Sequence, residues 1–247
     1  AAMTDWSAQF GFSRGDLELK VDLQGAGRPL ALIGANGAGK TTVLKILLGI
    51  ETPSSGHFRC GEKLLYSSEK SICVDPENRR MAYLPQGCGL FPHLDVLDNV
   101  GFGLQTQKGL SVSEVKKLSL QALEELDVSH LKTRNPIQLS AGERQKVALA
   151  RVLTMRPEMI LLDEPVSALD IMARREVREI LSEQLLELKI PAVLVTHDVR
   201  DVRELSADVA LLDKGKISLQ GCYKEISERR GDEKLHPFLK EFLGDFN

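Results

Sequence analysis

The sequence has few aromatic residues and no long apolar run, and the second shortage excludes a membrane-spanning helix. Phe, Trp and Tyr together make up 5% of the 247 residues. No apolar run approaches the roughly 20 residues that a membrane-spanning helix needs, and the first five residues lack the basic start and apolar stretch of a signal peptide. We therefore expect a cytoplasmic protein whose role at any membrane comes through a partner.

Cysteine and surplus charge are also scarce. The four cysteines form no C-x-x-C pair and have no zinc-ligand spacing with histidine, so free thiols in a reducing compartment are expected. A formal net charge of −3 does not predict a nucleic-acid partner, because phosphate backbones need a concentrated basic surface. The basic clusters that exist are short and interleaved with acidic residues, which is typical of solvated helix faces.

Hydrophobic patterning predicts an α/β fold in a single domain spanning residues 1–247. Short alternating patterns predict antiparallel strands in 5–23 and 57–66. Compact apolar runs separated by helical stretches predict a mostly parallel sheet with strands near 30–33, 159–162, 192–195 and 209–212. The intervening helices are expected near 143–155, 171–188 and 199–206. Between about 93 and 137 the pattern is helical alone, which predicts a helical subdomain inserted into the core.

A glycine-rich loop follows the first apolar run. Its sequence fits G-x-x-x-x-G-K-[ST] and predicts a P-loop core that binds a nucleoside triphosphate. Small residues are needed because backbone N–H groups must converge on the phosphates without a Cβ in the way. By chance this pattern arises in roughly one such chain in a hundred, but here it also joins a strand to a helix. The predicted nucleotide contacts are Gly34, Ala35, Asn36, Gly37, Ala38, Gly39, Lys40, Thr41 and Thr42.

Two acids, Asp163 and Glu164, end the apolar run 159–162. Ligands in open parallel sheets bind at the carboxyl ends of the strands, which is also where the glycine-rich loop lies. We expect Asp163 to hold Mg²⁺ through water and Glu164 to orient or deprotonate an attacking water. Lys40 is expected to bridge the β- and γ-phosphates, and Thr41 to ligate Mg²⁺. Alternatively, the strand simply ends in solvated acids.

Residues 139–143 read Leu-Ser-Ala-Gly-Glu, which resembles the signature L-S-G-G-[QE] of the ATP-binding cassette (ABC) family. Other segments match further family motifs in the family's order: Gln86 matches the Q-loop, 167–170 the D-loop, and His197 the switch histidine. The resemblance covers essentially the whole chain. It implies an ATPase whose catalytic residues are Glu164, His197, Gln86 and Lys40, with Gln86 also beside Mg²⁺.

The resemblance further implies that two copies form a homodimer, packed head to tail. Each ATP would lie between one copy's phosphate loop and the other's Ser140, Gly142, Glu143 and Asp170. Ser140 and the Gly142 N–H are expected at a helix N-terminus, which favours anions. The implied partners of such a dimer are transmembrane permease subunits, with a solute-binding protein acting upstream and no nucleic acid. The protein would then be peripheral on the inner face of the cell membrane.

Two positions depart from the family pattern. Ala141 replaces the first glycine of the signature pair, and its methyl group is harmless only if φ there is negative. The adenine-stacking tyrosine is also missing, because Arg14 occupies the position where that ring is often found. Phe12 is our first candidate for the base contact and Arg14, through its guanidinium plane, the second.

Residues 75–86 and 90–100 are similar to importer ATPases of the molybdate/tungstate, sulfate, polyamine and sugar group. Within that group the nearest resemblance is to molybdate/tungstate and related oxyanion importers. Alternatives are a polyamine, sugar or iron importer, a soluble regulatory cassette, and a binding module without turnover. Residues 91–94 are candidates for docking a coupling helix of the permease, or else are core residues of the helical subdomain. Residues 237–247 resemble the start of a linker to a regulatory domain that this sequence does not contain, which favours a truncated chain.

Overall fold

The computed structural model describes residues 5–106, 109–229 and 235–244, and their strands form one sheet of eleven strands in the order β6-β5-β4-β1-β2-β11-β10-β3-β9-β8-β7. The remaining residues, including parts of 93–137 and 237–247, lie outside this description. One end of the sheet is antiparallel. It consists of β1 (Trp6–Arg14), β2 (Leu17–Gly25), β4 (Ser55–Cys60), β5 (Lys63–Ser67) and β6 (Ile72–Cys73).

The other end of the sheet is the parallel core that the apolar runs predict. Its strands are β3 (Leu30–Ile33), β7 (Met81–Leu84), β8 (Met159–Asp163), β9 (Ala192–Val195) and β10 (Asp208–Asp213). A further strand, β11 (Lys216–Cys222), pairs antiparallel with β10 and touches β2 at one parallel position. Every residue of β3, β8 and β9 is buried, because helices or other strands cover both faces.

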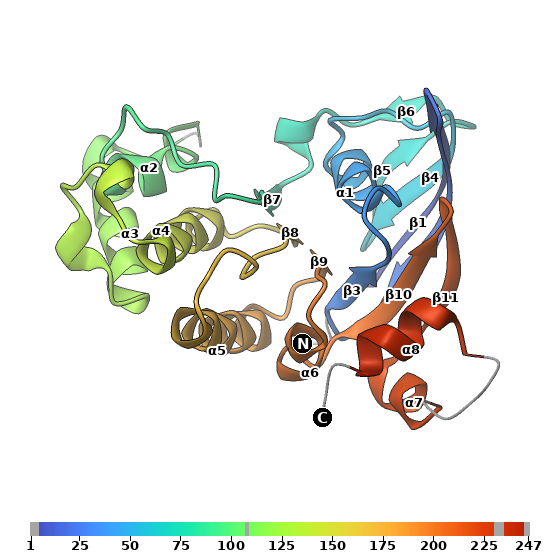
Figure 1. Cartoon of the computed structure of the whole chain (residues 1–247). Coiled ribbons are helices and arrows are strands. Elements are labelled where there is room, and N and C mark those ends of the chain that lie inside the picture. Colours follow the sequence, from blue (N-terminus) through green and yellow to red (C-terminus); the bar gives the residue numbers. More distant parts are fainter. Residues whose placement is uncertain (1–4, 107–108, 230–234, 245–247) are drawn as a thin grey trace.

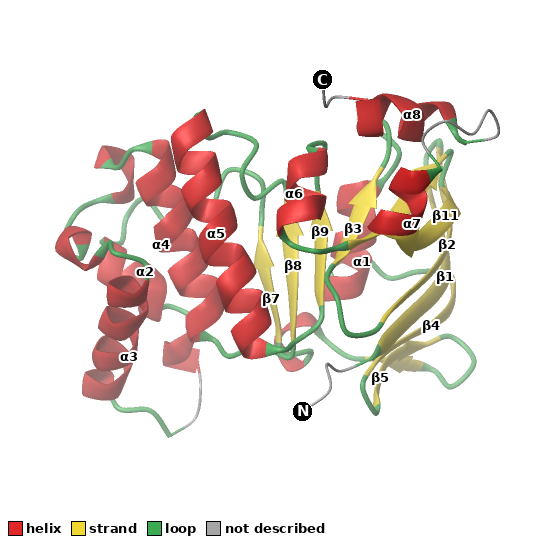
Figure 2. Ribbon diagram, turned by 90° about the horizontal axis from the view of Figure 1, so that it is seen from below, coloured by secondary structure: helices red, strands yellow, loops and turns green. Residues whose placement is uncertain are grey.

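Helices cover the two faces of the parallel strands (Figures 1 and 2). Ala31 and Ile33 of β3 contribute to a core with helices α4 (Ala141–Thr154), α5 (Ile171–Leu188) and α6 (Val199–Glu204). Leu30 and Leu32 contribute to a second core with α1 (Lys40–Leu48) and the antiparallel strands. This alternation follows from the two-residue period of a strand. It places α1 and α4 on opposite faces of the sheet.

The segment between β7 and α4 contains only helices among its described residues. These are α2 (Val96–Gly101), α3 (Val112–Glu125) and short 3₁₀ turns at 104–106, 129–131 and 136–138. Buried Asn99 stabilises the entry to this segment, since its side chain bonds the backbone of Phe91 in both directions. The fold class predicted from the sequence is therefore confirmed. Within the described ranges, no helix has the length and apolarity that crossing a membrane would require.

The described part of the C-terminal segment forms helices rather than extended chain. After β11 come α7 (Tyr223–Glu228) and α8 (Pro237–Gly244). Leu239, Phe242 and Leu243 of α8 are buried in the core that also contains α5 and α6. Figure 1 shows α7 and α8 together beside β10 and β11.

Candidate functional site

The phosphate loop joins β3 to α1, and glycine is required at its positive-φ positions. Gly34, Gly37 and Gly39 have φ values of 152°, 79° and 103°. A Cβ on Gly34 would lie 2.2 Å from the carbonyl oxygen of Leu212 in β10. Backbone position and steric room therefore both exclude a side chain at Gly34. The loop consequently holds its N–H groups at the start of α1, where the helix dipole favours an anion.

Lys40 begins α1, and its ammonium group lies within the loop. The side chain is buried, and Nζ donates to the carbonyl oxygens of Gly34 at 2.8 Å and Ala35 at 3.0 Å. Burial lowers the pKa of Lys40, while the nearby carboxylates of Glu164 and Asp163 act against that shift. The cation is thus held beside the two acids that the sequence predicts at the end of β8.

Arg79 anchors the far end of α1, although no local sequence pattern points to this role. Its buried guanidinium donates to the carbonyl oxygens of Ile46 at 3.0 Å and Leu47 at 2.7 Å. It also donates to Val74 at 2.8 Å. The Leu47 carbonyl lies in the last turn of α1, where carbonyls lack a partner further along the helix, and the Ile46 carbonyl accepts a second bond beside that from the Gly49 N–H. Arg79 therefore fixes the helix on which Lys40 is mounted.

Glu164 is the point at which the predicted catalytic residues meet. Gln86 Nε2 donates to Glu164 Oε2 at 3.0 Å, and His197 Nε2 lies 3.0 Å from Glu164 Oε1. These side chains follow β7, β9 and β8, three adjacent parallel strands that end at the same edge of the sheet. Glu164 has a φ of 50°, a left-handed conformation that costs a non-glycine residue roughly 1 to 2 kcal/mol. Its N–H donates to Val195 at 3.0 Å, which holds the strained turn against β9.

Asp163 precedes Glu164 and is almost completely buried. The hydroxyl of Tyr83 in β7 donates to its Oδ2 at 3.2 Å, and burial together with the charge of Asp163 raises the pKa of that hydroxyl. Carboxylate, hydroxyl and amide oxygens are the donors that Mg²⁺ prefers, so Asp163, Thr41 and Gln86 fit this ion. The described residues contain no group of three or more His, Cys, Asp or Glu side chains placed to hold a metal ion.

The signature segment forms the N-terminus of α4. Ser140 is the N-cap: its hydroxyl accepts from the Glu143 N–H at 3.2 Å, and its own N–H donates to Glu143 Oε2 at 2.7 Å. These hydrogen bonds lower the pKa of Glu143. Glu143 therefore caps the helix in this structure, whereas its predicted contact with nucleotide remains a proposal.

The alanine in the signature is accommodated. Ala141 is the first residue of α4 and does not have a positive φ, so its methyl group is compatible with the backbone. At the next position, a Cβ on Gly142 would lie 3.3 Å from the Cβ of Ala173 in α5. Close packing of the two helices therefore explains glycine at 142, and Lys146 of α4 pairs with Glu176 of α5 at 2.6 Å.

The structure brings Lys40, Gln86, Asp163, Glu164 and His197 together, but it does not bring Ser140 and Gly142 to them. No interaction in the described ranges joins the signature segment to the phosphate loop, and α4 and α1 lie apart in both views (Figures 1 and 2). Asp170 caps α5 by accepting from Met172 and Ala173, each at 3.0 Å. Beside it, Ile171 and Met172 are 80% and 76% exposed.

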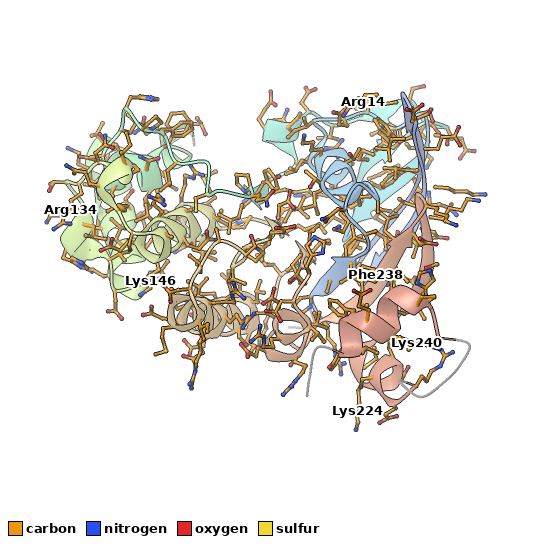
Figure 3. All side chains as sticks on the ribbon, in the orientation of Figure 1. Arg14, Arg134, Lys146, Lys224, Phe238 and Lys240 are labelled. Atoms are coloured by element: carbon orange, nitrogen blue, oxygen red, sulfur yellow. The ribbon has the colours of Figure 1, made fainter. Side chains whose placement is uncertain are left out.

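The two candidates for the adenine contact differ in accessibility. Phe12 is 8% exposed and belongs to the core shared with α1. Arg14 is exposed, forms an ion pair with Glu51, and lies with its guanidinium carbon 5.9 Å from the centre of the Phe12 ring. Figure 3 labels Arg14 beside the antiparallel strands. Arg14 is therefore the more accessible of the two candidates, and a contact between it and the base remains a proposal.

Replacing Arg14→Ala is expected to raise the dissociation constant for ATP roughly fivefold, the loss expected for one exposed guanidinium–ring contact. Isothermal titration with ATP and with inorganic triphosphate measures the effect, because only the first ligand carries a base. Arg80→Ala is the matched control: Arg80 is similarly exposed and ion-paired, with Glu158 at 3.1 Å. An equal loss of affinity for ATP and for triphosphate would show that Arg14 contacts the phosphates and not the base.

Comparison with known proteins agrees with this geometry. Residues 18–167 match the model of the family described as ABC transporter, and the chain belongs to that family. The sulfate/thiosulfate import ATP-binding protein CysA of Brucella melitensis is 37% identical over 223 residues, which are 89% of this chain and 59% of that protein. The probable sulfate/thiosulfate import ATP-binding protein CysA of Chlorella vulgaris is 37% identical over 222 residues, 88% of each chain.

A solved structure shows the same fold. The ATP-binding cassette MJ0796, in a dimeric structure bound to ADP and Pi, superposes with a TM-score of 0.74 at 24% identity, over 88% of this chain and 98% of that chain. Several bacterial relatives are considerably longer than this chain, which spans 59% of the Brucella melitensis protein. The relatives are named for sulfate and thiosulfate, so the predicted molybdate/tungstate specificity is not supported. Sulfate and thiosulfate are nevertheless oxyanions, the wider class that was predicted.

Proposed function

We propose that this chain is the ATP-hydrolysing subunit of an ABC importer. The observation that carries the proposal is the Glu164 carboxylate, which contacts Gln86 and His197 at 3.0 Å each and lies beside the buried Lys40. A carboxylate held at the carboxyl edge of a parallel sheet, next to a phosphate loop, is suited to accept a proton from water. A binding module without turnover would have no need for this arrangement.

The reaction follows from these positions. Lys40 and the loop N–H groups bind the β- and γ-phosphates, and Glu164 accepts a proton from the attacking water. The water oxygen bonds to the γ-phosphorus as the bond to the bridging oxygen of ADP breaks, and the proton leaves with inorganic phosphate. We propose that His197 and Gln86 contact the γ-phosphate once it displaces their bonds to Glu164. When bound at Thr41, Asp163 and Gln86, Mg²⁺ neutralises charge on the phosphate oxygens.

The catalyst in this proposal is a homodimer. We propose that the N-terminus of α4, through the N–H groups of Ala141 and Gly142, binds a phosphate of the facing copy, because the capping box occupies only the Ser140 and Glu143 N–H groups. The exposed apolar side chains of Ile171 and Met172, beside Asp170, offer a surface for a second copy. The solved cassette that shares this fold is dimeric in its described structure, which supports the same assembly here.

Permease subunits are the proposed membrane partners, with a solute-binding protein upstream and the ATPase on the cytoplasmic face. Phe91 is half-buried, with its ring centre 4.5 Å from that of Phe102 and 5.9 Å from that of His93. Phe102 itself is 43% exposed. We propose this exposed aromatic cluster, reached directly from the Q-loop, as the docking surface for a permease helix. The names of the relatives support sulfate or thiosulfate as the cargo.

Phe102→Asp is expected to abolish sulfate uptake while leaving the ATPase rate of the isolated chain within about twofold, because surface substitutions rarely disturb a fold. Uptake of labelled sulfate is measured in a strain that carries the complete transporter and lacks its own ATPase subunit. Val112→Asp is the matched control, since Val112 is 75% exposed on α3 of the same helical segment. Normal sulfate uptake with Phe102→Asp would refute the proposed docking surface. Uptake of another solute instead of sulfate would correct the cargo.

A further inference from the structure

Two arginines on one face of α5 converge on a single carboxylate beside the switch histidine. Arg174 and Arg178 are four residues apart and therefore neighbours on the helix surface. Arg178 Nη2 donates to Asp198 Oδ2 at 2.7 Å, and Arg174 Nη1 lies 3.6 Å from the same oxygen. Asp198 directly follows His197, and its Oδ1 caps α6 by accepting from the Arg200 N–H at 2.9 Å. The helix after the D-loop is thereby joined to the loop that carries His197.

Arg178 is the buried member of the pair. Only 5% of its side chain is exposed, and its Nε donates to Asp201 Oδ1 at 2.5 Å. Asp201 in turn accepts from the hydroxyl of Thr196, whose oxygen accepts from the Asp198 N–H at 3.0 Å. The residues on either side of His197 are therefore both tied to Arg178. A buried charge of this kind is stable only when it is paired, so the connection is a fixed part of the fold.

Arg174 extends the connection in the opposite direction, to the D-loop. Its Nη2 donates to the carbonyl oxygens of Leu169 at 3.0 Å and Ser167 at 3.4 Å. The Ser167 hydroxyl then donates to the Glu164 carbonyl at 3.2 Å. Arg174 also lines a cavity of about 290 Å³ that lies between the D-loop and the switch loop and is bordered by Glu164 and His197. One side chain thus bridges the two loops on either side of this cavity.

We propose that Arg174 and Arg178 are positioning residues that hold His197 on Glu164 and transmit a displacement of the D-loop to the switch histidine. This inference rests on the proposed ATPase function. The His197 side chain is 39% exposed, so its direction depends on the backbone that carries it. Arg178 fixes that backbone, and Arg174 sets its distance from residues 167–170. A second cassette that pressed on the D-loop would therefore move His197 through Arg174.

The test uses Arg174→Met, which keeps the apolar stem and removes the charge and the donors. It is expected to lower kcat roughly tenfold, because small displacements of a catalytic group are costly, while the dissociation constant for ATP stays within about twofold. Arg174→Lys is expected to recover part of the loss. Arg175→Met is the matched control, because Arg175 is exposed on the same helix and pairs only with Glu179 among the interactions described for it. Reduced kcat in the control as well would indicate a general effect of α5.

A double-mutant cycle separates positioning from stability. In a His197→Ala background, Arg174→Met is expected to have no further effect on kcat; a full tenfold loss there would overturn the proposal. Asp198→Asn provides a second variant that keeps the side-chain volume, and it should lower kcat as Arg174→Met does.

If the unsubstituted chain shows no turnover, the proposed function fails, and NMR of the histidine rings still tests this inference. Arg174→Met should shift the His197 ring resonances and Arg175→Met should not; unshifted resonances in both would refute the positioning role.

Discussion

Glu164→Gln is expected to lower ATP hydrolysis by a factor of roughly 10³, within the range that removal of a general base produces. The amide keeps the size of the side chain but cannot accept a proton from water. ATP binding should be retained, because the phosphate loop and Lys40 are unchanged. The ATP-bound dimer should then accumulate, since hydrolysis no longer separates the two chains. Phosphate release measures the first effect, and size-exclusion chromatography with ATP measures the second.

Glu158→Gln is the control for that experiment. Glu158 lies at the opposite end of strand β8, where it pairs with Lys63 at 2.5 Å. The two glutamates therefore flank the same strand, but Glu158 lies outside the site, and its replacement should leave the hydrolysis rate unchanged. A chain that hydrolyses ATP equally well with Glu164→Gln would have its base elsewhere, or would owe its activity to a contaminant.

Lys40→Met is expected to raise the dissociation constant for ATP roughly 100-fold, the effect of losing charged hydrogen bonds to the phosphates. In the free protein Nζ bonds two loop carbonyls, Gly34 and Ala35, so the cation is already held where the triphosphate must lie. Methionine has a similar length and apolar stem. Because burial lowers the pKa of Lys40, the fold pays a desolvation cost for this cation that methionine avoids.

The thermal midpoint of unfolding without nucleotide should therefore be unchanged or slightly raised by Lys40→Met. Binding is measured by isothermal titration with MgATP. Lys45→Met serves as the control, since Lys45 lies in the last turn of the same helix, away from the loop. Unchanged ATP affinity with Lys40→Met would show that the triphosphate binds elsewhere.

The strands and loops that carry the site could be predicted because each has a signal in its own stretch of sequence. Continuous apolar runs mark β3, β8 and β9, and the glycine pattern after β3 has one conformational explanation. Strand β7 was missed because its residues alternate between half-buried and buried over only four positions. Short strands of this kind depend on pairing with a neighbour, here β8, more than on their own sequence.

The contacts that organise the site could not be predicted, because they join residues far apart in the chain. Arg79 has no local signal in the sequence, yet it is buried against the end of α1. The left-handed turn at Glu164 has no local signal, since glutamate rarely adopts it. The capping box between Ser140 and Glu143 is the exception: its S-x-x-E spacing is a local signal, but Glu143 was expected to contact nucleotide instead.

The central claim is that one chain holds only half of each catalytic site, and mixing two inactive variants tests it most directly. Lys40→Met disables the phosphate loop, and Ser140→Asp places a negative charge at the N-cap of α4, where a carboxylate still caps the helix but repels phosphate. Each variant alone should be inactive. Mixed in equal amounts, half of the dimers should contain one of each, with one intact site of two, so hydrolysis should recover to about a quarter of the unsubstituted rate. A mixture as inactive as its components would contradict the shared site.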